Sequence, residues 1–273
     1  MQIARLNLGA VVLLLATGVG GSWTHAQSAN AQSAADSPRL LSLDARQLLA
    51  LANEARAAAG AGPLQWDPAL ADAARKHCLR MAAEGGISHQ FAGEAGLTAR
   101  AGEAGAHFST VEENVASGTD PTDPFETHQG WMHSPGHRAN LLNREIDRVG
   151  IAVVVSHGVN YAVADYARAV PVLSQAEVEA GFAALLRAKG LSIRKGNKDA
   201  RAYCALAEGS RIPEFYAPPR YMIRWQNPDV TQLPQGVLSQ ITAGHYRAAE
   251  VGSCAPQDVE GQFTLYRVAV LFY

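Results

Sequence analysis

The feature that most constrains this chain is a pair of β-rich runs that follows a series of capped helices. Val149–Val155 and Val159–Ala167 are joined by Ser156-His157-Gly158, which predicts a β-hairpin. Apolar strands need helices packed on their faces, and the preceding sequence supplies helical patterns. We therefore predict a layered α/β domain over residues 42–170.

The helices are predicted from their start and stop signals. Ser42 caps a helix that runs from Leu43 to about Ala59, and Asp67-Pro68 opens a second one that ends at Gly85-Gly86. A long polar connection then reaches Asp123-Pro124, which opens a short helix. Ser134-Pro135-Gly136 breaks that helix and starts another over His137–Leu142.

A second, smaller α/β domain is predicted over residues 171–273. It begins with the capping box Ser174–Glu177, and a helix around Asp199–Ala207 follows. Tyr221–Trp225 and Phe263–Tyr273 are predicted strands. The sequence shows no internal repeat.

Composition and charge restrict the class of protein. The 273 residues are 48% apolar and 18% charged with a net charge of −2, which is typical of a soluble globular protein. No basic stripe is visible, so we expect no nucleic-acid partner.

The N-terminus is typical of an export signal. Residues 1–26 carry Arg5 and then an apolar stretch, and cleavage is expected after Ala26 or Ala31. Residues 27–41 are predicted to be a flexible leader. We expect a secreted or periplasmic protein with no transmembrane segment in the mature chain; the alternative is an uncleaved anchor.

Export permits disulfides. Cys204 and Cys254 both fall in the C-terminal unit and are predicted to pair, which leaves Cys78 as a buried thiol. The alternative is three free thiols.

Three residues in the first domain could carry chemistry. His89, Glu113 and His137 supply two imidazoles and one carboxylate, a workable set for a divalent cation with open positions for water. The same three residues could also do acid–base work without a metal.

The order of several motifs resembles the CAP superfamily (SCP-like extracellular domain), in its bacterial branch. The resemblance covers about Leu48 to Tyr166. It rests on Asn53–Arg56, Leu64–Asp67, Ser88-His89, Glu113–Ala116, Trp131–Leu141 and Val149–Ala152. It implies an α-β-α sandwich and a central cleft with His89, Glu113 and His137 as its polar residues. In animal members a second glutamate follows the helix tryptophan by three positions, and here that position is Ser134.

Together these features lead to a first functional hypothesis. The chain is expected to be a non-enzymatic binding module whose cleft holds a divalent cation, zinc first of all, through His89 and His137, with Glu113 positioning a water or an imidazole. It would present a groove to a lipid, a peptide or an envelope glycan. The alternative is a metal-dependent hydrolase of extracytoplasmic peptide or glycan, with Glu113 as general base. A third interpretation treats the trio as a hydrogen-bonded polar core.

Neighbouring polar residues receive structural interpretations. His133 and His137 lack the glutamate that a zinc peptidase motif needs after its first histidine, so His133 is either solvent-facing or a rim ligand. His77 and His128 are expected on the surface. Glu112 is the rival of Glu113, and the family register selects Glu113. Arg56 and Arg100 are expected to link helices to loops by hydrogen bonds to carboxylate or carbonyl groups. The sequence does not identify these partners.

Overall fold

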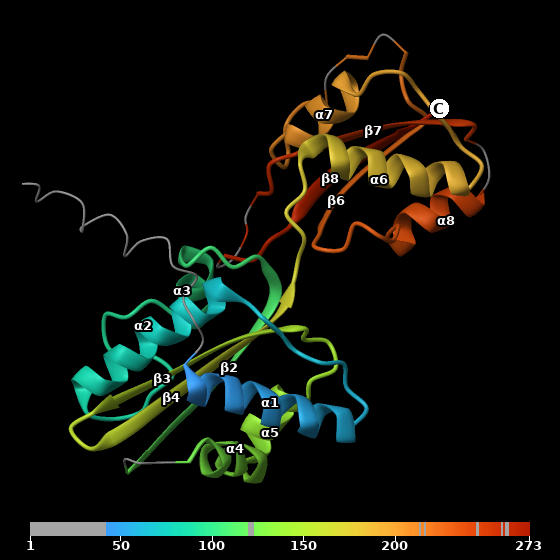
Figure 1. Ribbon diagram of the computed structural model, residues 1–273. Coiled ribbons are helices and arrows are strands. Elements are labelled where there is room, and N and C mark those ends of the chain that lie inside the picture. Colours follow the sequence, from blue (N-terminus) through green and yellow to red (C-terminus); the bar gives the residue numbers. More distant parts are fainter. Residues whose placement is uncertain are drawn as a thin grey trace, which may run out of the picture. The chain divides into compact units, whose positions relative to one another are not determined.

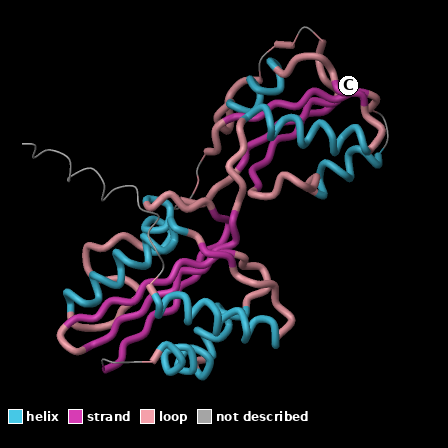
Figure 2. The backbone as a smooth tube through the Cα atoms, viewed as in Figure 1, coloured by secondary structure: helices cyan, strands magenta, loops and turns pink. Residues whose placement is uncertain are grey.

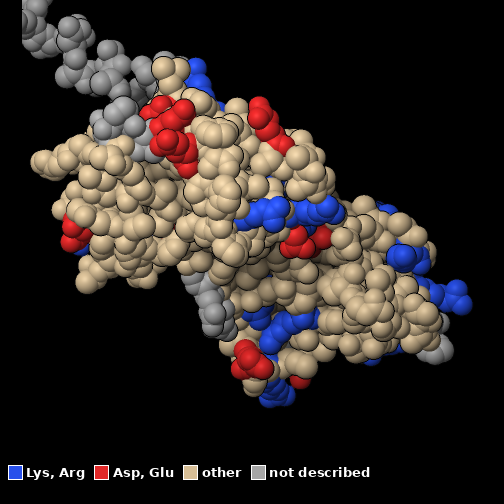
Figure 3. All heavy atoms as spheres, turned by 90° about the horizontal axis from the view of Figure 1, so that it is seen from below, with Lys and Arg blue, Asp and Glu red and all other residues tan. Residues whose placement is uncertain are grey.

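The computed structural model describes residues 42–119, 123–212, 214–215, 217–243, 246–257, 259 and 262–273. The predicted signal peptide (1–26) and leader (27–41) lie outside the described residues. Among the helices in the described ranges, none has the length and apolar character needed to cross a bilayer. On the face drawn in Figure 3, basic side chains lie in small groups with acidic groups between them.

The first part of the chain is built around a four-stranded sheet with the order β1-β3-β4-β2. β3 and β4 form the predicted antiparallel hairpin, β2 pairs antiparallel with β4, and β1 pairs parallel with β3. Its elements are α1 (Leu43–Ala58), β1 (Gln65–Trp66), α2 (Pro68–Glu84), α3 (Leu97–Glu103), β2 (Phe108–Thr119), α4 (Pro124–His133), α5 (Pro135–Leu142), β3 (Arg148–Ser156) and β4 (Val159–Ala169).

Helices cover both faces of this sheet (Figures 1 and 2). On one face, Leu48 of α1, Trp131 of α4 and Leu141 of α5 pack against the sheet in one apolar cluster. On the other, Cys78 and Met81 of α2 pack against the opposite sides of the same strands. The expected α-β-α sandwich is therefore confirmed.

The predicted helix starts are also confirmed, and their caps explain them. The Asp67 carboxylate accepts from the backbone N–H groups of Ala69 and Leu70, and Gly85 ends α2 in the left-handed conformation. Ser42 caps α1 in the same manner. Ser134 stands at the N-cap position of α5, but its side chain makes no cap hydrogen bond.

A second four-stranded sheet follows, with the order β5-β7-β8-β6. The capping box at Ser174 is present, and Cys204 and Cys254 form the predicted disulfide while Cys78 stays a buried thiol. The boundary between residues 170 and 171 stays a prediction. The elements are α6 (Gln175–Ala188), β5 (Ser192–Ile193), α7 (Lys198–Ala205), β6 (Tyr221–Asn227), α8 (Gln235–Ala243), β7 (Ala248–Cys254) and β8 (Tyr266–Phe272).

The two sheets have the same topology, although the sequence shows no internal repeat. In each sheet, with strands counted in chain order, a helix leads to a two-residue first strand that pairs parallel with the third strand. The third and fourth strands form an antiparallel pair. The second strand pairs antiparallel with the fourth. In the second sheet α6 and α8 share one apolar cluster, as α1, α4 and α5 do in the first. The chain therefore builds one fold twice.

In each repeat, one helix packs closely on a glycine of the third strand. A Cβ at Gly150 of β3 would overlap the backbone of α2 at Leu70 and Ala71, and a Cβ at Gly252 of β7 would overlap the backbone of α7 at Ala200. In both repeats, then, the helix after the short strand lies directly on a glycine of the third strand. By the pairing with the short strand, Val149 corresponds to Ala249, so Gly252 lies two residues further along its strand than Gly150 does.

Candidate functional site

The structure brings together the three residues singled out in the sequence. His89 lies in the loop after α2, Glu113 on β2 and His137 on α5. The His89 Nδ1 atom is 2.8 Å from Glu113 Oε1, and the ring centroids of His89 and His137 are 6.3 Å apart. The Glu113 side chain is 2% exposed, whereas that of His89 is 61% exposed. A buried carboxylate thus holds an imidazole at the surface.

Arg100 of α3 is the partner of Glu113. Its Nη2 atom lies 2.5 Å from Glu113 Oε2, and its Nη1 atom donates to the His89 carbonyl oxygen at 3.1 Å. The guanidinium therefore stabilises the ionised form of Glu113 and fixes the backbone of the loop that carries His89. The sequence predicted that Arg100 ties a helix to a loop, and the structure identifies the carboxylate.

A second carboxyl group, Asp165 of β4, lies next to Glu113 across the sheet. It is fully buried. Burial and the neighbouring charge of Glu113 raise the pKa of Asp165 well above its usual range. Burial therefore favours the neutral form of Asp165. Sequence reasoning missed Asp165; a lone acidic residue in the apolar run Tyr161–Ala167 was the available signal.

His77 of α2 holds the loop that carries His89 by hydrogen bonds. The prediction that it is exposed is wrong: its side chain is completely buried, because Nδ1 bonds Glu94 Oε1 and Nε2 bonds the Ser88 carbonyl oxygen, both at 2.7 Å. Burial of Glu94 opposes its ionisation, but bonds from the Phe91 N–H and from His77 outweigh it and lower the pKa of Glu94. Both ends of the loop around His89 are thereby held.

Two asparagines attach the helix of His137 to the strand of Glu113. Asn114 Nδ2 donates to the His137 carbonyl oxygen at 2.9 Å, and Asn140 Nδ2 donates to the Glu113 carbonyl oxygen at 3.1 Å. Burial and the nearby His89 lower the pKa of His137, so its imidazole is neutral at neutral pH. A neutral imidazole offers a nitrogen lone pair to a metal ion.

The remaining predicted residues lie outside this cluster. Glu112 accepts from Asn143 Nδ2 at 2.9 Å, which leaves Glu113 as the carboxylate of the site. His133 is exposed, with Nδ1 bonded to the Gln129 carbonyl oxygen at 2.7 Å. His128 was expected on the surface and is instead 6% exposed, with neither ring nitrogen hydrogen-bonded to any described residue. Arg56 is fully buried and donates to carbonyl oxygens, among them those of Leu141 and Ile146.

Zinc lies about 2 Å from each imidazole nitrogen, so two rings on one tetrahedral zinc have centroids about 5 to 5.5 Å apart. The ring centroids of His89 and His137, at 6.3 Å, are somewhat further apart than this. Among the described residues, no three His, Cys, Asp or Glu side chains are arranged as ligands. Glu113 faces Nδ1 of His89, which is the position of an orienting group behind a metal ligand.

The comparisons with known proteins agree with this architecture. The sequence model of the CAP (cysteine-rich secretory protein) family matches residues 49–166. Among curated proteins, the uncharacterized protein YkwD of Bacillus subtilis is 30% identical over 119 residues, which is 44% of this chain and 46% of YkwD. The uncharacterized membrane protein YlbC of the same species is 32% identical over 108 residues, 40% of this chain and 31% of YlbC. The chain thus spans less than half the length of either relative.

Solved structures match a similar share of the chain. An extracellular protein containing a SCP domain from Bacillus anthracis is 29% identical, with a TM-score of 0.40, over 45% of this chain and 39% of that one. An outer surface protein from Borrelia burgdorferi is 20% identical, with a TM-score of 0.43, over 46% of this chain and 92% of that one. Residues 49–166, within the first repeat, thus match the sequence model of the CAP family.

Proposed function

We propose that this chain is an exported, non-enzymatic binding module whose CAP domain takes up a divalent cation, zinc first of all, between His89 and His137. The cation would help the domain hold a lipid, peptide or glycan of the cell envelope. One observation carries the proposal: the exposed His89 imidazole is held through Nδ1 by a buried, arginine-paired carboxylate and faces a second imidazole at 6.3 Å.

The hydrogen bonds of Glu113 favour binding over hydrolysis. A metal-dependent hydrolase would use this carboxylate as a general base on a metal-bound water, which requires it to be free to accept a proton. Here one oxygen of Glu113 faces His89 and the other Arg100, and the side chain is 2% exposed. A carboxylate with both oxygens engaged is suited to orienting an imidazole.

The test is zinc titration of the full chain by calorimetry, for the wild type, the His89→Ala/His137→Ala variant and the His133→Ala control. His133 is an exposed imidazole at the end of α4, outside the cluster. We expect one zinc per chain in the wild type and the control, and at least about a hundredfold weaker binding in the double variant. Equal binding in all three proteins would overturn the cation site and leave the polar-core interpretation.

A further inference from the structure

Two arginines lie on the α7 side of the second sheet. Starting from Gly252, on which α7 rests, one row across this sheet is Gly252, Ala269 and Arg224. Arg224 of β6 therefore lies on the face that packs against α7.

The next row on the same face adds a second arginine. It consists of Cys254, Arg267 and Gln226. This face of the second sheet thus holds two arginines in neighbouring rows.

These arginines line a cavity of 270 Å³. Its walls are contributed by Glu208, Arg224, Trp225, Gln226, Gln257 and Arg267. Arg267 is 7% exposed, Arg224 is half-buried, and the acidic Glu208 is exposed at the margin. The volume suits a small ligand or one functional group of a larger one.

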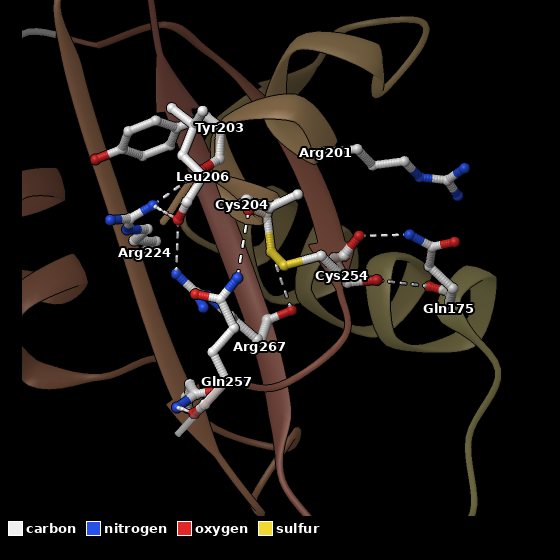
Figure 4. Close-up of a disulfide and its surroundings, with 12 residues drawn as sticks. Gln175, Arg201, Tyr203, Cys204, Leu206, Arg224, Cys254, Gln257 and Arg267 are labelled. Atoms are coloured by element: carbon white, nitrogen blue, oxygen red, sulfur yellow. Dashed lines mark hydrogen bonds between the residues drawn. A yellow bond between two sulfur atoms is a disulfide. The ribbon is translucent and has the colours of Figure 1, made fainter. Parts of the chain in front are cut away.

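One carbonyl group holds the two guanidinium groups side by side (Figure 4). Arg224 Nη1 donates to the Leu206 oxygen at 2.5 Å, and Arg267 Nη2 donates to the same oxygen at 3.2 Å. Arg224 also lies over the ring of Tyr203. Both cations are thereby positioned before any ligand arrives, and no carboxylate of a described residue lies within ion-pairing distance of Arg224.

We propose that this cavity is a binding site for an oxyanion, namely the phosphate or carboxylate group of a small ligand. Guanidinium groups offer planar pairs of N–H donors that match such groups, and partial burial strengthens the attraction. The neighbouring amides of Gln226 and Gln257 provide further polar groups in the same cavity wall.

The experiment is calorimetric titration of the full chain with inorganic phosphate and, separately, with acetate. The ionic strength is kept constant with sodium chloride, and EDTA removes any cation. The test variant is Arg224→Gln. The matched control is Arg187→Gln, which removes the same charge from an exposed position on α6 of the same repeat. Thermal melting establishes that both variants are folded.

We expect at least about tenfold weaker binding in Arg224→Gln and unchanged binding in Arg187→Gln. Binding of phosphate alone assigns the site to phosphate groups, and binding of acetate as well extends it to carboxylates. If the wild type bound neither anion, or if both variants bound as the wild type does, the proposal would be overturned.

A second variant tests the site without disturbing the arginines. Glu208→Gln removes the one carboxylate that lines the cavity, and its exposure makes it dispensable for folding. We expect phosphate to bind on the order of threefold more tightly, because the variant removes one exposed negative charge that repels the anion. Unchanged or weaker binding would contradict an electrostatic site here.

Discussion

Arg100 supplies the positive charge for a carboxylate inside the first sheet. Its guanidinium is 7% exposed and pairs with Glu113, whose side chain is 2% exposed and lies beside the buried Asp165. Two buried carboxyl groups therefore depend on one cation. Removing one partner of such a pair leaves an uncompensated charge in a medium of low polarity, which is far more costly than losing a surface ion pair.

We therefore predict that Arg100→Met lowers the free energy of unfolding by about 3–5 kcal/mol. Urea denaturation measures the change, with Arg138→Met on the exposed face of α5 as control. The control should change the free energy by less than about 0.5 kcal/mol. A similar small change in both variants would mean that Glu113 is stabilised without its arginine.

His128 gives a prediction about pH. Burial lowers its pKa below the ordinary value of 6.5, so the unfolded chain binds the proton more readily than the folded one. This histidine therefore costs stability as the pH falls below about 6.5. Replacing it with leucine also removes two buried nitrogens that bond no described residue.

His128→Leu should raise stability by about 1–2 kcal/mol and reduce its loss between pH 7.5 and pH 5. Melting curves across that range test both effects. A variant whose stability falls with acid as steeply as that of the wild type would assign the acid sensitivity to other groups.

At the residue scale, the order of the motifs predicted which side chains form the candidate site. The contacts that hold these side chains in place could not be predicted. His89, Glu113 and His137 each stand inside a recognisable block. Asp165 and His77 do not, because their burial depends on Arg100 and Glu94, which are brought to them by other elements. A charged residue in an alternating strand is by default expected to face solvent.

At the scale of elements, sequence patterns predicted the capped helices and the hairpin but missed β2. This strand has the polar sequence Phe108–Thr119, and the polar connection predicted there contains α3 as well. Its inward positions carry Glu113 and Asn114, which are satisfied by partners from other elements. Period-two hydrophobicity, the usual signal of a strand, is therefore weak at the place where the site lies.

The repeated glycines make the equivalence of α2 and α7 testable. Gly150→Ala and Gly252→Ala should each lower the free energy of unfolding by about 3 kcal/mol, because the new Cβ atoms meet helix backbone that cannot move independently. Gly62→Ala, where a Cβ meets nothing, is the control. If either strand glycine tolerated alanine as the control does, the helix would not rest on that strand as described.

At the scale of the whole molecule, the chain uses one topology twice, and only the first copy has a recognisable sequence. The repeat escaped sequence reasoning because corresponding positions differ in chemistry: Glu113 matches Met222, and Gly150 matches Glu250. Both repeats have a helix that rests on a glycine of the third strand. The second repeat also has a disulfide between α7 and β7.

The disulfide should stabilise the second repeat in particular. Cys204→Ala/Cys254→Ala releases a link across 50 residues, which the chain-entropy model values at about 4 kcal/mol. Hydrogen exchange should show lost protection in β5–β8 and retained protection in β1–β4. Equal loss in both sheets would indicate that the two repeats unfold as one unit.

The central claim is that two imidazoles are the protein ligands of a cation in the first repeat. X-ray absorption at the zinc edge of the zinc-loaded full chain tests it most directly. The account predicts two imidazole nitrogens bound to the zinc, with water oxygens completing the coordination and the signal lost in His89→Ala/His137→Ala. Coordination by three or more protein ligands, or a spectrum unchanged in that variant, would contradict it.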